Sequence, residues 1–151
     1  MKSYSDKLAR YRCRTWLILF CLWALIHVPS NGFCSILLTL GPEETAKQVA
    51  LGIQTGSASE VAKNFNTLVD LSIPGYDDTY SKNQAENILK EFFYQNIVKT
   101  FKITKRGSSA DGSQYSIGEL QTTKKVYRVY FLIKAVSGQH LVHQFQIQEN
   151  N

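Results

Sequence analysis

The chain has 151 residues, of which 44% are hydrophobic and 19% charged, and its formal net charge is +5. This composition is too apolar for a disordered tail, and the length suits one domain rather than several. Residues 1–14 contain five basic side chains and one acidic one, a net +4, whereas the rest contains 12 basic and 11 acidic. The body of the chain is therefore nearly neutral, which argues against a nucleic-acid-binding surface.

The N-terminal segment has the pattern of a secretory signal peptide. Eleven consecutive apolar residues, 16–26, follow the basic stretch, and the run ends before Pro29, Ser30 and Gly32. A bilayer core needs roughly 20 apolar residues in a helix, so this run is short for a membrane span. We expect residues 1–32 to be cleaved before Phe33 and the remainder to be exported to the periplasm or cell envelope. In the alternative, an uncleaved N-terminal anchor would be the protein's contact with the membrane.

The cysteines do not predict a disulfide-stabilised domain. Cys13 and Cys21 lie in the leader, and only Cys34 would remain after cleavage, so an internal disulfide is excluded. Lipid modification of Cys34 is an alternative, against which the bulky Phe33 before it argues. We expect residues 33–41 to be a linker and residues 42–149 to be one domain held by its hydrophobic core.

The first half of this domain has the periodicity of three helices. Pro42 suits a first helical position, and apolar residues then recur at helical spacing up to Gly56. Two capping boxes, residues 57–60 and 81–84, predict the starts of two more helices. The second of these helices ends in the aromatic pair Phe92-Phe93.

The second half predicts strands. A short strand is expected at residues 69–73, before the turn Pro74-Gly75, with residues 77 and 78 in a loop. Four main strands are expected at residues 101–106, 114–120, 125–136 and 140–148, and their short connections predict antiparallel pairing. Alternation places residues 127, 129, 131 and 133 of one strand, and 141, 143, 145 and 147 of the next, on the core face. The pattern predicts an α+β fold with the helices on one side of an antiparallel sheet.

Six segments taken in order carry a family resemblance: residues 71–75, 80–86, 92–93, 114–118, 127–130 and 140–144. Over roughly residues 46–149 the chain resembles a family of exported bacterial domains of unknown function in the nuclear transport factor two-like (cystatin-like) superfamily. The resemblance implies helices packed on a strongly curved antiparallel sheet with a cone-shaped cavity between them, and it implies no activity. The family pattern would place a histidine near Lys105, where this chain has Lys105-Arg106. A role for a histidine at that position is therefore not expected.

Four side chains are candidates to line the implied cavity: Phe93, Tyr115, Tyr127 and His143. They could surround a small apolar ligand, or they could simply be packed and hydrogen-bonded core groups. An isomerase- or dehydratase-type enzyme would also need a carboxylate at the cavity, and among the acidic residues only Glu119 falls near the core face. His140 and His143 lie three apart on a strand and point to opposite faces, so neither a metal site nor another cofactor is expected.

The outer face of the sheet is a candidate contact surface. It is expected to carry Arg128, Tyr130, Gln144 and Gln146, and aromatic, arginine and amide side chains of this kind suit a protein contact. The resemblance implies a homodimer through this face, with a solvated face as the alternative. The sequence thus predicts a non-catalytic ligand-binding or protein-interaction module. The alternatives are a cavity-based isomerase or dehydratase, and a structural subunit whose cavity is filled by Phe92, Phe93 and Phe145.

Overall fold

A computed structural model describes residues 41–150, which form three helices and six strands. In chain order these are α2 (Pro42–Gln54), α3 (Ala58–Lys63), β1 (Phe65–Ile73), β2 (Tyr76–Ser81), α4 (Lys82–Gln95), β3 (Val98–Ser108), β4 (Gln114–Thr122), β5 (Val126–Val136) and β6 (Gln139–Glu149). The predicted α+β class is confirmed. The predicted signal peptide, residues 1–32, and linker residues 33–40 lie outside the described part. None of the described helices combines the length and hydrophobicity needed to cross a bilayer.

The two predicted capping boxes lie at helix starts. Ser57 Oγ accepts a hydrogen bond from the backbone N–H of Glu60 at 3.4 Å, at the start of α3. At α4, Ser81 Oγ accepts from the Gln84 N–H, and the side-chain oxygen of Gln84 accepts from the Ser81 N–H at 3.1 Å. These bonds satisfy N–H groups that a helix leaves free in its first turn. α3 ends at Lys63, and Phe65 already begins β1.

The strands form one sheet in the order β2-β1-β6-β5-β4-β3. Every neighbouring pair is antiparallel except β1 and β6, which are parallel. The sequence predicted five of the six strands and missed β2. That strand is polar and largely exposed at the sheet edge, so it lacks the alternation that signals a half-buried strand. Residues 77 and 78, expected in a loop, pair with β1 across the Pro74-Gly75 turn, where Gly75 has a φ of +90°.

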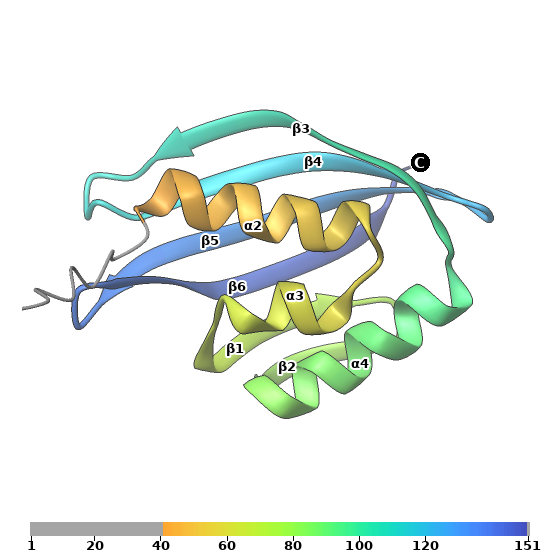
Figure 1. The fold of residues 1–151 in the computed structure, drawn as a ribbon, viewed down its shortest axis with the longest axis horizontal. Coiled ribbons are helices and arrows are strands. Elements are labelled where there is room, and N and C mark those ends of the chain that lie inside the picture. The colour runs from red at the N-terminus through yellow and green to blue at the C-terminus, as the bar shows by residue number, and fades with distance from the viewer. Residues whose placement is uncertain (1–40, 151) are drawn as a thin grey trace, which may run out of the picture. The chain divides into compact units, whose positions relative to one another are not determined.

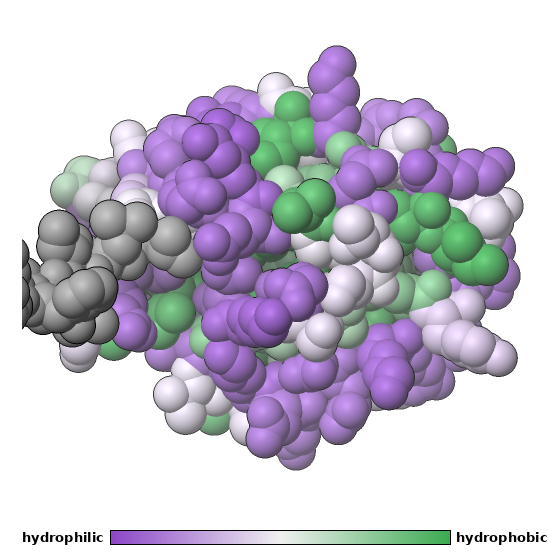
Figure 2. All heavy atoms as spheres, in the orientation of Figure 1, coloured by the Kyte–Doolittle hydropathy of each residue, from purple (hydrophilic) through white to green (hydrophobic). Residues whose placement is uncertain are grey.

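All three helices cover the same face of the sheet, and the sheet curves around them (Figure 1). α2 contacts β3, β4, β5 and β6, whereas α4 contacts β1 and β2. We call the helix-covered face the inner face and the opposite face the outer face. Seen from the helix side, most of the surface is hydrophilic, with separate hydrophobic areas between the polar side chains (Figure 2).

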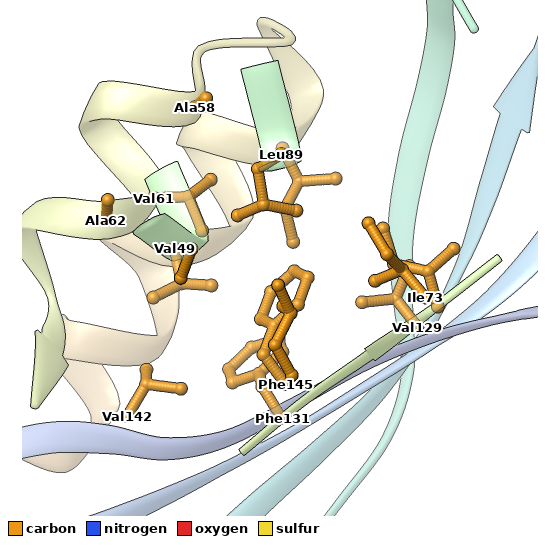
Figure 3. Close-up of a cluster of buried hydrophobic side chains, with 14 of the residues drawn as sticks. Val49, Ala58, Val61, Ala62, Ile73, Leu89, Val129, Phe131, Val142 and Phe145 are labelled. Carbon is orange, nitrogen blue, oxygen red and sulfur yellow. The ribbon is translucent and has the colours of Figure 1, made fainter. Parts of the chain in front are cut away.

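The space between helices and sheet is filled by packed side chains. Phe131 and Phe145 are fully buried, with ring centroids 6.3 Å apart, and Phe65 packs against Phe145 at 5.6 Å. Figure 3 shows these rings of β5 and β6 among Val49, Val61 and Leu89 of the helices. These buried rings lie between the helices and the sheet, where the family resemblance implied a cavity.

A bulge in β6 changes which of its side chains enter the core. Ile133 pairs with Val142, but the next residue back on β5 pairs with Gln144, so His143 is an extra residue in β6. Val142 is therefore buried together with Phe145 and residue 147. The predicted alternation, which placed residues 141 and 143 on the core face, is wrong at this end of the strand because a bulge shifts the pattern by one residue.

Candidate interaction surface on the sheet

Two of the four predicted cavity residues lie together on the inner face. Phe93 packs against Phe92, whose ring meets the Tyr127 ring edge-on at a centroid distance of 5.2 Å. The Tyr127 O–H donates to Asn96 Oδ1 at 3.0 Å, and the Asn96 amide donates to the Phe92 carbonyl at 3.0 Å. Burial raises the pKa of Tyr127 above its ordinary value. The Tyr127 hydroxyl is thus a satisfied polar group that anchors the end of α4 (Lys82–Gln95) to the sheet.

Tyr115, predicted to share the inner face with Tyr127, lies on the outer face. Burial alternates along β4: Ser116, Gly118 and Leu120 are buried and point inward, whereas Tyr115 is half-buried and points outward. Its ring stacks on that of Tyr130 at a centroid distance of 6.2 Å.

His143 also leaves the predicted cavity, because it occupies the bulge of β6. Its Nε2 atom is buried and lacks a hydrogen-bond partner within residues 41–150. Burial lowers the pKa of His143, the positive charge of Lys134 lowers it further, and the carboxylate of Asp70 partly offsets both. The imidazole is therefore held neutral near pH 7.

The four residues predicted for a contact surface do lie on one face. Tyr130 pairs with Gln146 across β5 and β6, and Gln144 lies beside it at the next outward position of β6. Arg128 is one outward position from Tyr130 along β5 and pairs with Glu119 of β4. Glu119 is thus on the outer face, which removes it as a carboxylate for the interior.

Large side chains of β4 and β5 form a continuous outer ridge, which we define as Tyr115, Ile117, Tyr130 and Leu132. Tyr115 pairs with Leu132, Ile117 pairs with Tyr130, and all four are partly buried. Within residues 41–150 the helices lie on the inner face, so none of them covers this ridge (Figure 1). Sequence reasoning missed Ile117; once Tyr115 is placed outward, alternation along β4 identifies it.

A hollow of about 280 Å³ lies on the outer face beside the ridge. We call it the acidic hollow, and its outward side chains are Asp70, Ser72, Asp77, Thr79, Gln144 and Gln146. The Thr79 hydroxyl donates to Asp70 Oδ1 at 2.7 Å, so one carboxylate is held in place. A second hollow of about 290 Å³, across the ridge, is lined by residues that include Lys105, Glu119 and Arg128.

The described residues do not gather a metal-binding set. Within residues 41–150, no group of three or more His, Cys, Asp or Glu side chains is placed to hold an ion. The arrangement on the outer face offers instead what protein contacts use: aromatic and aliphatic area, amides and charges of both signs.

The comparisons with known proteins identify relatives of this fold. A family model described as "Domain of unknown function (DUF4783)" matches residues 46–148. A DUF4783 protein of Bacteroides ovatus is 32% identical, with 69% of this chain and 94% of that chain covered and a TM-score of 0.65. An NTF2-like protein of unknown function from Cytophaga hutchinsonii is 10% identical, with 74% and 91% covered and a TM-score of 0.53. An uncharacterised cystatin-fold protein from Novosphingobium aromaticivorans is 11% identical, with 72% and 97% covered and a TM-score of 0.52. The comparison with curated proteins finds no match.

Proposed function

The chain belongs to the DUF4783 family of domains of unknown function, and we propose that it is an exported, non-catalytic interaction module that forms a homodimer through the outer face of its sheet. Its fold is the NTF2-like, cystatin-like fold. The signal-peptide pattern of residues 1–32 supports export. The outer ridge supports the interaction surface.

The ridge is the observation that carries this proposal. Tyr115 and Tyr130 stack beside Ile117 and Leu132 on a face where the neighbouring outward residues are charged or amides. Aromatic side chains surrounded by polar ones are the composition of a protein interface, since the centre excludes water and the rim stays hydrated. A second copy is a suitable partner because charges of both signs occupy this face, so opposite charges can meet across a two-fold contact.

The interior supports binding at the surface rather than in a cavity. Phe131 and Phe145 are fully buried where the family resemblance implied an open cone, and the Tyr127 hydroxyl is bonded to Asn96. An isomerase-type mechanism needs a base beside a substrate-sized space. The candidate Glu119 faces outward, opposite Arg128.

The test is the oligomeric state of residues 33–151, measured by sedimentation at several protein concentrations. We expect a dimer, and we expect Tyr130→Ser to weaken it by about tenfold or more, since an aromatic residue at the centre of an interface commonly contributes about 2 kcal/mol. The matched control is Tyr94→Ser, at a tyrosine of α4 that is 86% exposed, which should leave the dimer unchanged. A chain that is monomeric at every concentration would overturn the homodimer.

A further inference from the structure

The geometry points to one arrangement of the two copies: the two-fold axis runs parallel to the strands, so that the outer ridge of each copy lies against the acidic hollow of the other. This inference rests on the proposed homodimer and adds its orientation and its pairwise contacts. It follows from three features of the outer face, namely where the large side chains lie, how the strands are aligned, and how charge is distributed.

The outer face is divided by size across its midline. The sheet order places the midline between β6 and β5, with β4 and β3 on one side and β1 and β2 on the other. The ridge lies on β5 and β4, where the outward residues are large. The acidic hollow lies on β6, β1 and β2, where Ser72, Asp70 and Thr79 are short. The half on β5 and β4 therefore carries the larger apolar side chains, and the other half carries the shorter polar ones.

Ridge and hollow also lie level with each other along the strands. Strand pairing defines two rows across the sheet, one through Ile117, Tyr130, Gln146 and Ser72, and one through Tyr115, Leu132, Gln144 and Asp70. In each row, one ridge residue and one hollow residue lie on the two strands next to the midline. The other ridge residue and the other hollow residue each lie one strand farther out. A rotation about an axis parallel to the strands therefore places Ile117 of one copy opposite Ser72 of the other, and Tyr130 opposite Gln146. An axis across the strands would place ridge on ridge and leave the two hollows facing each other.

Charge favours the same axis. The outward residues of β1 and β2 include Asp70 and Asp77, whereas those of β3 include Lys105; on β4 and β5, Glu119 and Arg128 pair with each other. Lys105 continues the Ile117 row on one side, and Asp77 continues the Ser72 row on the other. The axis parallel to the strands brings opposite charges together in both halves of the contact. The other axis brings like charges together, which is unfavourable.

The orientation can be read from cross-links between introduced cysteines. The domain suits this test because Cys13, Cys21 and Cys34 all precede residue 41, and residues 41–150 carry their own core. A solved DUF4783 relative from Bacteroides ovatus is 94% covered by the match, so the relative's crystallised chain has about the extent of this domain. Ser72→Cys and Ile117→Cys domains are mixed, allowed to exchange subunits, and treated with a short thiol cross-linker.

We expect the mixture to give a cross-linked dimer and each variant alone to give little. In the inferred dimer the two Ser72 residues lie on opposite sides of the axis, each one and a half strand spacings from it. With strands about 4.8 Å apart, the two residues are separated sideways by roughly 14 Å. Efficient cross-linking of Ser72→Cys with itself would overturn the inferred axis while the homodimer stands. A dimer in sedimentation without any cross-link in the mixture would overturn it as well. A monomer in sedimentation would instead remove the proposed homodimer itself.

Charge reversal gives an independent readout that needs no cysteine. We expect Asp77→Lys and Lys105→Glu each to weaken the homodimer by about threefold, because each variant opposes like charges twice. An equimolar mixture of the two should recover affinity, because opposite charges then meet on both sides. Lys90→Glu, on the helix side, is the control and should change nothing. Equal affinity for all three variants would overturn the charge pairing.

Discussion

His143 is a titratable residue in an unusual position, the extra residue of a β-bulge. Its Nε2 atom is buried without a partner in the described part of the chain, and its neighbours are Lys134 on β5 and Asp70 on β1. The bulge explains why sequence alternation placed this imidazole in the core: one additional residue in β6 reverses the face of every residue before it. A bulge depends on how two strands align, and neither strand encodes that alignment alone.

The lowered pKa of His143 predicts a pH-dependent loss of stability. In the unfolded chain the imidazole takes up a proton near its ordinary pKa of about 6.5, whereas the folded chain resists protonation to lower pH. Its contribution to stability is therefore complete above pH 6.5 and decreases as the pH falls toward the folded-state pKa. We expect His143→Gln to reduce the loss of unfolding free energy between pH 7.5 and pH 5.

Urea unfolding at the two pH values measures this difference. The matched control is Gln148→Ala, which removes an exposed, non-titrating side chain of β6 and should retain the wild-type loss. The same loss of stability in His143→Gln and wild type would show that carboxylates elsewhere dominate the acid response.

Among the elements, α2 and α3 meet at a glycine. Gly52 is buried on α2, and a Cβ atom built there would lie 2.9 Å from both the backbone nitrogen and Cγ2 of Val61 on α3. The backbone of a second helix cannot yield as a flexible side chain would. The absence of a side chain at position 52 thus allows the close approach of the two helices.

This contact reverses the usual effect of replacing glycine in a helix. Gly→Ala normally favours a helix by roughly 1 kcal/mol. At Gly52 we expect Gly52→Ala to lower the free energy of unfolding by about 1–3 kcal/mol, because overpacking separates α2 from α3. Chemical denaturation measures the change, and Lys47→Ala, at an exposed position of the same helix, should stay within about 0.5 kcal/mol of wild type. A stabilised Gly52→Ala would show that the helices can move apart at no cost.

The elements also show which features the sequence can predict. Ser57 and Ser81 are local signals whose partners lie three residues away, so both helix starts were predicted correctly. β2 was missed because its existence depends on pairing with β1 and on no apolar pattern of its own. Tyr115 was placed on the wrong face because the face of β4 is set by its register with β3 and β5. The outer residues of β5, by contrast, follow from the unbroken alternation between Tyr127 and residue 134.

For the whole molecule, charge is unevenly distributed along the chain. Residues 1–14 carry a net +4, whereas the rest of the chain combines 12 basic with 11 acidic side chains. On the outer face Asp70 and Asp77 lie toward one side of the sheet and Lys105 lies at the other, with Arg128 and Glu119 paired between them. A nearly neutral domain with a polar arrangement of charge suits association with its own copy better than association with a polyanion.

The export proposal predicts the mass of the mature chain. A basic segment followed by a short apolar run directs export, and Ser30 and Gly32 are the small residues that cleavage before Phe33 requires. Intact-mass measurement of the protein from the envelope fraction of its source should therefore give residues 33–151. Leu19→Arg places a charge in the apolar run and should leave the full-length precursor in the cytoplasm. Leu51→Arg, at a position of α2 that is 65% exposed, is the control and should be processed normally.

The same mass distinguishes the ways in which the domain could be held at the envelope. The full-length mass in the membrane fraction would identify an uncleaved anchor and reject cleavage before Phe33. A chain beginning at Cys34 with the added mass of a lipid would identify a lipoprotein. Either form would hold the domain by its N-terminus at a membrane surface, which raises the local concentration of second copies and favours a weak homodimer. A full-length chain found only in the cytoplasm would contradict export. The fold of residues 41–150 does not depend on that outcome.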